Sequence, residues 1–316
     1  MESFAYFAVV QLKSGIFDTA TLLKAVRAGD YPSLARALTW VENELPGASD
    51  LLRALEPDNK VPVVGLTGPP GAGKSTLING LISAWTASGK KVAVLAIDPT
   101  SPFNYGSLLG DRLRMSEHFT NPLVFIRSVA TRGSLGGLSE KVIELTDVLR
   151  CAGFDLILVE TVGVGQSEIE IAGLADTTVV VMVPEAGDEV QTMKSGIMEI
   201  ADVFVVNKSD REGADSLVNA LRQLTAHPRK DGWVVPVVKA AATLGTGITE
   251  VLESVLKHRS SDTFNAKRTY LLTEKAYRLI QRQRMQGVSK TALFLAVEKA
   301  VKQGDFNLYR FVAGWH

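Results

Sequence analysis

The sequence predicts an α/β fold, in which a mostly parallel central sheet carries helices on both faces. From Lys60 onward, short runs of Val, Ile and Leu alternate with longer segments in which apolar residues recur at helical spacing. Several of the short runs are apolar throughout, as expected of strands that are buried on both faces. We expect strands at residues 61–67, 91–97, 123–129, 155–160, 177–183, 203–207 and 234–238.

The chain divides into three expected parts. Residues 1–59 form an N-terminal helical segment, residues 60–262 form the α/β domain, and residues 263–316 form a C-terminal helical extension. We expect the N-terminal helices to cap the core of the sheet, although a docking site for a partner would show the same spacing. The C-terminal helices follow a completed sheet with limited core left to cover, so they favour a dimer or partner surface.

The composition is that of an ordinary soluble protein. The 34 basic and 34 acidic residues give a net charge of +0, which argues against nucleic acid or an anionic membrane as the main partner. A single cysteine, Cys151, cannot form an internal disulfide, and the four histidines are scattered. No apolar run in the sequence approaches the roughly 20 residues of a membrane-spanning helix, and the N-terminus resembles neither a signal nor a transit peptide. We therefore expect a cytoplasmic protein without a His or Cys metal site.

The stretch from Gly68 to Thr76 matches the pattern G-x-x-x-x-G-K-[ST], the phosphate-binding loop of P-loop NTPases. It lies between an expected strand and an expected helix, where backbone N–H groups point inward and hold a phosphate chain. Lys74 would reach the β- and γ-phosphates, and Ser75 would bind Mg²⁺. A plain glycine-rich turn would not account for the Lys-Ser pair in register. The expected phosphate contacts are Gly68, Gly71, Ala72, Gly73, Lys74, Ser75 and Thr76.

Acidic residues stand at or near the ends of other strands. Asp98 follows the second expected strand, and Asp111 lies in the charged segment beyond it. Both are candidates for the Mg²⁺ shell, although a turn-forming aspartate before proline would explain Asp98 and a solvated loop would explain Asp111. Glu160 closes the fourth strand, and Gly163 follows three residues later. This spacing resembles the D-x-x-G element, whose acid helps to hold Mg²⁺ and whose Gly N–H contacts the γ-phosphate.

Two further features concern hydrolysis. Val164 cannot orient an attacking water, so intrinsic hydrolysis should be slow or should depend on another group. The stretch 184–196 combines a loop with the start of a helix and contains Asp188 and Lys194. It is a candidate for a third nucleotide-responsive segment, although the pattern alone favours a capped surface helix.

Selection of the base is expected at the ends of the sixth and seventh strands. Asn207, Lys208 and Asp210 form an N-K-x-D element after the sixth strand. The Asp210 carboxylate would accept hydrogen bonds from guanine N1–H and N2–H₂, for which adenine offers no matching donors. Lys208 would stack its aliphatic stem on the base, and the backbone N–H of Ala242 would meet guanine O6. These residues predict GTP or GDP as the ligand.

Together these motifs resemble the MeaB/ArgK family of methylmalonyl-CoA mutase-associated GTPases, in the SIMIBI class of P-loop proteins. The similarity covers nearly the whole chain from Thr19, and the run from Glu160 to Glu168 is highly specific. One departure is the run Ala240-Ala-Ala242, where the family often has Thr-Ser-Ala, but a backbone contact at Ala242 needs no side chain. The other matching segments are residues 68–76, 98–102, 110–115 and 207–210.

The resemblance implies a homodimeric switch whose GTP binding and slow hydrolysis gate the loading of adenosylcobalamin onto a methylmalonyl-CoA mutase-type enzyme and protect that enzyme. It also implies a third switch around Asp188 and Lys194, and a C-terminal arm that builds the dimer. The resemblance assigns Mg²⁺ to Ser75, Asp98, Asp111 and Glu160, and catalysis to Lys74, Glu160, Gly163, Asp188 and Lys194.

Two other functions stay open. Related GTPases insert metal ions into nickel enzymes, although they usually carry His- or Cys-rich segments that this sequence lacks. A nucleotide-binding accessory protein of an amino-acid transport system is the third hypothesis.

Overall fold

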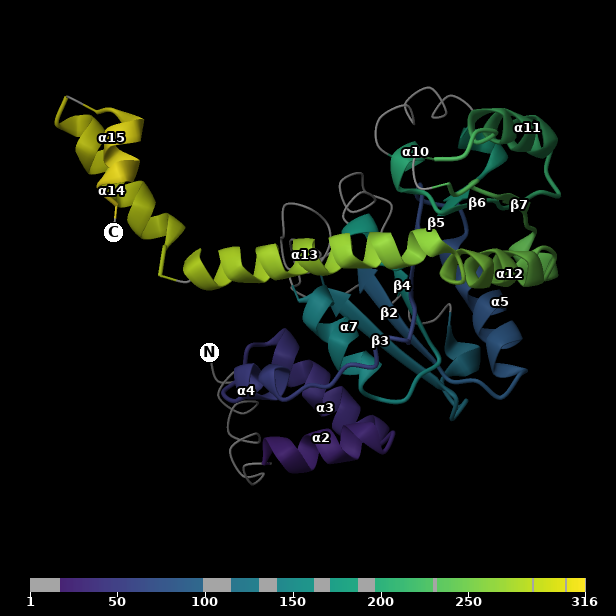
Figure 1. Cartoon of the computed structure of the whole chain (residues 1–316), viewed down its shortest axis with the longest axis horizontal. Helices are drawn as coiled ribbons and strands as arrows, with labels where there is room; N and C mark the ends of the chain where they lie inside the picture. The colour runs from purple at the N-terminus through teal and green to yellow at the C-terminus, as the bar shows by residue number, and fades with distance from the viewer. Residues whose placement is uncertain are drawn as a thin grey trace, which may run out of the picture. The chain divides into compact units, whose positions relative to one another are not determined.

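The computed structural model describes residues 18–98, 115–130, 141–161, 171–186, 197–229, 232–285, 287–304 and 306–315. The chain forms two compact units, of which one ends at Arg268 and the other runs from Thr269 to His316. Figure 1 shows the helices and strands along the chain.

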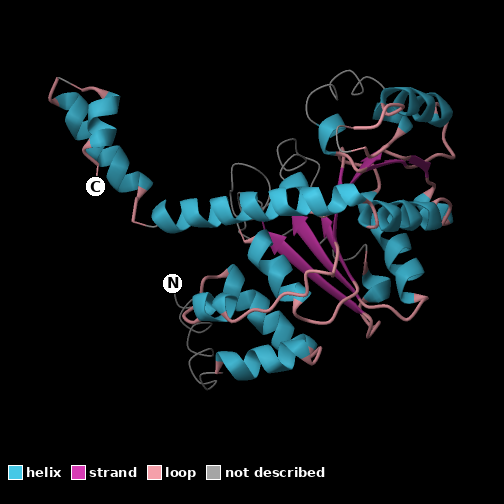
Figure 2. Ribbon diagram, viewed as in Figure 1, coloured by secondary structure: helices cyan, strands magenta, loops and turns pink. Residues whose placement is uncertain are grey.

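The first unit is built on a parallel sheet, drawn as magenta arrows in Figure 2. Its strands are β1 (Val63–Thr67), β2 (Val92–Asp98), β3 (Val124–Ala130), β4 (Leu156–Glu160), β5 (Thr177–Met182), β6 (Val203–Val206) and β7 (Val237–Lys239). The strand order is β3-β2-β4-β1-β5-β6-β7, and every neighbouring pair runs in parallel. The strand that leads into the expected phosphate loop, β1, therefore lies at the centre, between β4 and β5. The predicted α/β class is confirmed.

Helices cover both faces of this sheet, because successive strand residues point to opposite sides. The helices of the first unit are α2 (Thr19–Arg27), α3 (Tyr31–Glu42), α4 (Ala48–Arg53), α5 (Lys74–Thr86), α7 (Val142–Arg150), α10 (Ile197–Ile200), α11 (Ala214–Leu224) and α12 (Ile248–Arg259). Val64 and Leu66 belong to one core, which also takes side chains from α5, α11 and α12. Val63 belongs to the other core, with side chains from α2, α3, α4 and α7.

The N-terminal helices are part of the core of the sheet. Leu34 and Leu38 of α3 are fully buried and belong to the same cluster as Leu95 of β2. The helix begins where it does because the Asp30 carboxylate accepts a hydrogen bond from the Ser33 N–H at 2.8 Å. Hydrogen bonding with Ser33 also holds the pKa of Asp30 below its usual value. These helices thus cap the sheet, as the spacing of the leucines predicts.

Three aspartates that directly precede strands bind the backbone near the start of a neighbouring strand. Each carboxylate accepts a backbone N–H at 2.8 Å, and the three pairs are Asp155 with Lys91, Asp176 with Val63, and Asp202 with Thr178. The backbone N–H of each aspartate also donates to the carbonyl oxygen of its partner residue in the same pair. The combined bonds fix the register where β4, β5 and β6 begin.

The last strand differs from the expectation. It spans Val237–Lys239, whereas the sequence predicts a strand over residues 234–238. Pro236 has no N–H to donate to a sheet, and its carbonyl oxygen accepts a hydrogen bond from the Phe204 N–H. Hydrogen bonding to β6 therefore begins at the Pro236 carbonyl, and the strand itself begins at Val237.

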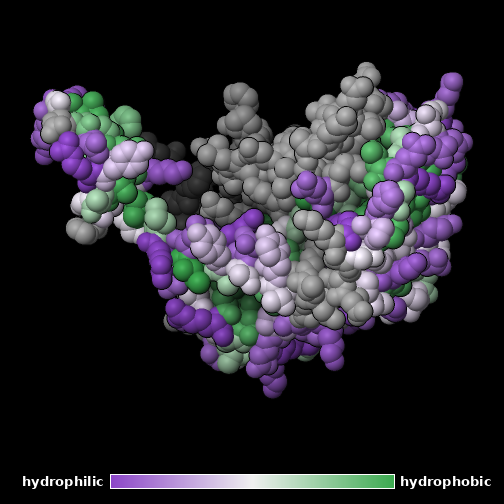
Figure 3. Space-filling model, turned by 45° about the horizontal axis from the view of Figure 1, so that its top comes forward, coloured by the Kyte–Doolittle hydropathy of each residue, from purple (hydrophilic) through white to green (hydrophobic). Residues whose placement is uncertain are grey.

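The second unit is helical. It contains the C-terminal part of α13 (Asp262–Met285), together with α14 (Lys290–Lys302) and α15 (Leu308–Ala313). The side chains of Ser289 and Asn307 cap α14 and α15. Hydrophobic patches, green in Figure 3, lie on the surface of the C-terminal helices at the upper left of that view. The exposed apolar residues include Tyr277, Ile280, Phe294, Leu295, Val301, Leu308 and Val312.

None of the described helices combines the length and the apolar composition that crossing a bilayer requires.

Candidate nucleotide-binding site

The phosphate loop connects β1 to the N-terminus of α5, which is the context that the motif requires. Gly68 has a φ of 137° and Gly73 a φ of 85°, a backbone region that residues with a side chain rarely adopt. Space is limiting as well, because a Cβ on Gly68 would lie 2.0 Å from the Val181 carbonyl oxygen. A Cβ on Gly73 would lie 2.4 Å from the amide nitrogen of Asn207. Both glycines are therefore needed for the loop to pack against the ends of β5 and β6.

Lys74, the first residue of α5, is buried within this loop. Its ammonium group donates to the carbonyl oxygens of Gly68 at 2.8 Å and Pro69 at 3.1 Å. The positive charge is thus held over the loop, at the positive end of the dipole of a helix of 13 residues. Charge and dipole together favour an anion at this position.

Ser75 and Glu160, both expected to bind Mg²⁺, are in direct contact. The Ser75 hydroxyl donates to Glu160 Oε1 at 2.6 Å, and both side chains are buried. Glu160 ends β4 and pairs with Leu66 of β1, so its side chain leaves the sheet on the side of α5. Two oxygen groups of the kind that Mg²⁺ prefers therefore lie side by side next to the phosphate loop.

The other residues expected around Mg²⁺ and the γ-phosphate are only partly described. Asp98 ends β2, and the pairing of Ala96 with Glu160 puts the backbone of Asp98 at the same edge of the sheet. The Asp98 side chain lies outside the described part of the chain, as do four whole residues, Asp111, Gly163, Asp188 and Lys194. The roles expected of these residues stay predictions.

Asn207 joins two loops of the site. Its side-chain nitrogen donates to the carbonyl oxygen of Ala72 in the phosphate loop at 2.8 Å. Its side-chain oxygen accepts the N–H of Ala242 at 3.1 Å. The sequence predicts that Asn207 and the Ala242 N–H contact the base; in this structure the two bond to each other. Asn207 therefore fixes the distance between the phosphate loop and the loop after β7.

The N-K-x-D element adopts a tight turn after β6. Lys208 has a φ of 54°, a left-handed conformation that costs a residue with a side chain roughly 1–2 kcal/mol. The turn is closed by two hydrogen bonds, from the Arg211 N–H to the Lys208 carbonyl and from the Ser209 N–H to the Ala240 carbonyl. Asp210 is exposed at the tip of this turn, so its carboxylate is accessible to a ligand. Strained residues of this kind cluster at ligand sites.

An exposed ion pair next to this turn was not predicted from the sequence. Arg211 binds Glu185, which lies in the short helix η3 (Pro184–Ala186) directly after β5. The hydrogen bond from Arg211 holds the pKa of Glu185 below its usual value. The pair connects the turn after β6 to the start of the segment that contains Asp188. No local pattern signals such a pair, because its members are 26 positions apart.

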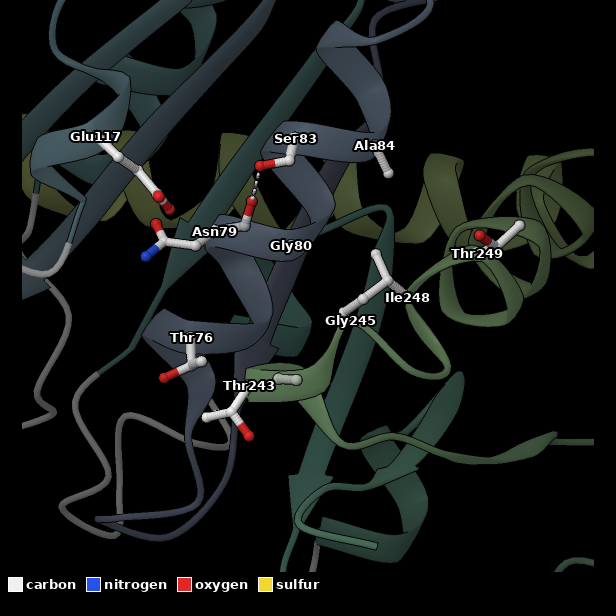
Figure 4. A pocket seen from close by; sticks show the side chains of 11 residues that line it. Thr76, Asn79, Gly80, Ser83, Ala84, Glu117, Thr243, Gly245, Ile248 and Thr249 are labelled. Atoms are coloured by element: carbon white, nitrogen blue, oxygen red, sulfur yellow. Dashed lines mark hydrogen bonds between the residues drawn. The ribbon is translucent and has the colours of Figure 1, made fainter. Parts of the chain in front are cut away.

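A cavity of about 490 Å³ lies along α5 on the side of the loop after β7. Figure 4 shows Thr76 and Thr243 at one end of it and Ser83 and Ala84 toward the other. Two of its lining residues, Thr76 and Ala242, are expected nucleotide contacts, whereas the others carry no signal in the sequence. The lining residues are Thr76, Asn79, Gly80, Ser83, Ala84, Glu117, Ala242, Thr243, Gly245, Ile248 and Thr249.

Comparisons with known proteins agree with this geometry. The sequence profile of a family described as methylmalonyl-CoA mutase-associated GTPase MeaB matches residues 34–294. A Pyrococcus abyssi protein whose name describes it as a GTPase is 45% identical over 290 residues, which cover 90% of this chain and 88% of that protein. The GTPase ArgK of Escherichia coli is 34% identical over 286 residues, which cover 85% of each chain.

A mitochondrial methylmalonic aciduria type A homolog of Caenorhabditis elegans is 37% identical over 255 residues, 74% of this chain and 64% of that protein. Among solved structures, the crystal structure of a LAO/AO transport system kinase matches with a TM-score of 0.68 and 25% identity, over 95% of this chain and 97% of that one. The family match spans the sheet, the phosphate loop and the N-K-x-D turn. This chain therefore belongs to the MeaB/ArgK family of P-loop GTPases, enzymes that hydrolyse GTP.

Proposed function

We propose that this GTPase is a homodimeric switch that gates the loading of adenosylcobalamin onto a methylmalonyl-CoA mutase-type enzyme and protects that enzyme. The choice of partner rests on the family match, whose description is methylmalonyl-CoA mutase-associated GTPase, and the switch rests on the contact between Ser75 and Glu160 at 2.6 Å. This contact links the helix that follows the phosphate loop to the strand that precedes the expected γ-phosphate sensor. A change in phosphate occupancy next to this contact is thereby coupled to the segment after Glu160.

The donor set next to the phosphate loop fits Mg²⁺. Ser75 supplies a hydroxyl oxygen and Glu160 a carboxylate oxygen, and both are hard ligands that Mg²⁺ accepts. Asp98 and Asp111 are the proposed further members of the shell. When bound, Mg²⁺ neutralises charge on the β- and γ-phosphates of the nucleotide.

The proposed binding of the nucleotide uses two separate parts of the chain. Lys74 and the N–H groups of residues 68–76 hold the phosphates, because positive charge and helix dipole coincide there. Asp210 accepts the guanine N–H donors, and Lys208 covers the face of the base. Asn207, which precedes Lys208, connects these two parts through its hydrogen bond to the Ala72 carbonyl oxygen in the phosphate loop.

We propose that intrinsic hydrolysis is slow and that the partner accelerates it. Val164 supplies no polar group for an attacking water. The proposed catalytic groups are Lys74, Glu160, Gly163, Asp188 and Lys194. Binding of the mutase would reorganise the segments that contain Gly163, Asp188 and Lys194.

The second unit supports the proposal of a homodimer. Its helices expose apolar side chains, and Phe294, Leu295 and Leu308 are each more than half exposed. Exposed apolar patches of this kind mark contacts with another protein surface. A second copy of the same helices offers a matching apolar surface, as in isologous dimers.

The test is to measure GTP turnover by the full chain with and without a methylmalonyl-CoA mutase in the presence of adenosylcobalamin. We expect the mutase to accelerate turnover by roughly tenfold or more, within the usual range of coupling between sites. Lys74→Ala should abolish turnover in both cases. Equal rates with and without each adenosylcobalamin-dependent acyl-CoA mutase tested would contradict the proposal.

A second candidate function is a nucleotide-binding accessory role in amino-acid transport, which the structural match to a LAO/AO transport system kinase favours. It predicts that the protein is recovered with the membrane fraction and that its function largely survives Lys74→Ala. Loss of function in Lys74→Ala, with recovery in the soluble fraction, would refute it.

A further inference from the structure

Two neighbouring positions on one face of β1 contact both ends of the chain segment that follows Glu160. Gly65 and Thr67 alternate with Leu66, so they point to the face of the sheet opposite to α5. Thr67 contacts Thr161, the residue directly after Glu160. Gly65 lies against Ile171, where the described chain resumes.

The first contact is a pair of buried hydroxyl groups. Thr161 Oγ1 donates to Thr67 Oγ1 at 3.0 Å and approaches the Leu66 carbonyl oxygen at 3.3 Å. The Thr161 N–H donates to the same carbonyl oxygen at 3.1 Å. Thr67 and Thr161 are almost completely buried. Because buried hydroxyls need partners, removal of one of them disturbs the other.

The second contact requires glycine at position 65. A Cβ on Gly65 would lie 2.3 Å from Ile171 Cγ1 and 2.9 Å from Ala175 Cβ, closer than carbon atoms approach without displacement. Ile171 is fully buried and begins the short helix η2 (Ile171–Gly173). Its side chain thus packs directly on the backbone of β1.

The two contacts lie two residues apart on β1, roughly 7 Å along a strand, although Thr161 and Ile171 are ten positions apart in the sequence. β1 is also the strand that ends at the phosphate loop. Thr161 adjoins Glu160, whose side chain is held from the other face of the sheet by Ser75. The backbone at residues 160 and 161 is therefore held from both faces.

We propose that Gly65, Thr67, Thr161 and Ile171 are positioning residues for GTP hydrolysis. They hold the backbone of Glu160 in register with the phosphate loop, so that the carboxylate meets Ser75. The proposal rests on the GTPase reaction and on the proposed role of Glu160. It predicts a lower rate of GTP hydrolysis with little change in nucleotide affinity, because none of the four residues is expected to contact the nucleotide.

The first test compares Thr161→Val with Thr161→Ser in the full chain. Valine keeps the shape but removes the hydroxyl, whereas serine keeps the hydroxyl. We expect Thr161→Val to lower kcat for GTP by roughly tenfold, the usual size of a positioning effect, while the Kd for GDP changes less than about threefold. Thr161→Ser should keep kcat within about threefold of the wild type. Unchanged kcat in Thr161→Val, or an equal loss in both variants, would overturn the proposal.

The second test uses compensating changes at the other contact. Gly65→Ala and Ile171→Ala should each lower kcat, the first by a clash and the second by a lost contact. The double variant Gly65→Ala/Ile171→Ala removes the closest clash, at Ile171, and leaves the contact with Ala175 Cβ at 2.9 Å, so we expect it to recover part of the loss. If the fold-loss of kcat in the double variant equalled the product of the two single losses, the two positions would act independently, which would contradict the proposal.

The matched control is Leu38→Ala, which removes a buried side chain from the same core as Ile171. It should lower the midpoint temperature of thermal unfolding, while kcat measured at temperatures below that midpoint stays at the wild-type value. An equal loss of kcat in Leu38→Ala would show that general destabilisation explains the other variants, and would overturn the proposal. Failure of the mutase to stimulate the wild type would refute the proposed switch function alone, since these tests measure intrinsic turnover.

Discussion

Glu160 has a structural and a proposed metal-binding role at the same time. It ends a buried strand, accepts a hydrogen bond from Ser75 at 2.6 Å, and is a carboxylate where Mg²⁺ is expected. Carboxylate and hydroxyl oxygens are hard ligands of the kind that Mg²⁺ prefers. Loss of the Glu160 charge should therefore weaken the proposed Mg²⁺ site.

We predict that Glu160→Gln raises the Mg²⁺ concentration for half-maximal GTP hydrolysis by roughly 10-fold to 100-fold, the usual cost of removing a group that supports a metal. The amide keeps the size of the side chain but removes the negative charge. A titration of the hydrolysis rate with Mg²⁺ measures the effect. Glu253→Gln, at an exposed position on α12, is the control and should leave the titration unchanged. An unchanged Mg²⁺ requirement in Glu160→Gln would remove Glu160 from the metal site.

Cys151 is the single thiol of the chain and reports on opening of the core. It is buried, and burial raises its pKa above the usual value, so little thiolate is present near neutral pH. We predict that iodoacetamide labels the native protein at least roughly 100-fold more slowly than the urea-unfolded protein. Quantification of the labelled protein by mass spectrometry gives both rates. Similar rates would mean that the core around α7 opens readily.

At the scale of elements, the aspartates that precede strands provide a matched comparison. Asp176 and Asp155 make the same pair of backbone bonds, but Asp176 is buried and also binds Arg150 at 2.7 Å. Asp155 is exposed. The two differ in burial and in the ion pair, so the same substitution should have different costs.

We predict that Asp176→Ala lowers the free energy of unfolding by about 3–5 kcal/mol, because it removes the buried carboxylate at 2.7 Å from the Arg150 guanidinium and leaves Asp147, at 3.8 Å, as the remaining acidic neighbour in the described part of the chain. Asp155→Ala should cost about 1 kcal/mol, the value of an ordinary hydrogen bond. Urea unfolding of both variants measures the difference. Equal losses would show that the backbone bonds, and not the buried ion pair, dominate.

The elements that the sequence predicts well are those set by local pattern. The strands follow from continuous apolar runs, and the start of α5 follows from the glycines and Lys74 of the phosphate loop. Each depends on residues within a few positions of one another, so the sequence contains the needed information.

The contacts that the sequence does not predict are long-range. Asn207 lies 135 positions from Ala72, which it binds, and Arg150 lies 26 positions from Asp176. The packing of Ile171 on Gly65 likewise depends on how β1 sits in the sheet. Such contacts follow from strand order, which composition and periodicity do not determine. The error at β7 has a different source, because Pro236 interrupts an otherwise apolar run.

At the scale of the whole molecule, the second unit is expected to set the oligomeric state. Its exposed apolar side chains lie on helices that follow a completed sheet. We predict that light scattering gives a mass of twice 34.0 kDa for the wild type and a monomer for Phe294→Glu. Lys299→Glu, on the same helix and also exposed, is the control and should stay dimeric. A wild-type monomer would exclude the proposed dimer, and a dimeric Phe294→Glu would move the interface elsewhere.

The nucleotide site is also a property of the whole fold. It joins the phosphate loop after β1, Glu160 at the end of β4, and the turn that carries Asp210 after β6. Parallel strands bring these distant segments to one edge of the sheet. The proposed function therefore requires that this site binds a guanine nucleotide by both its phosphates and its base.

Isothermal titration calorimetry with GTP and ATP, in the presence of Mg²⁺, tests this claim most directly. We predict that GTP binds at least roughly 1,000-fold more tightly than ATP, because adenine would leave the Asp210 carboxylate without its hydrogen-bond donors. Asp210→Ala should abolish most of this preference while ATP binding stays as weak as before. Equal affinities of the wild type for GTP and ATP, or no binding of either, would contradict the account.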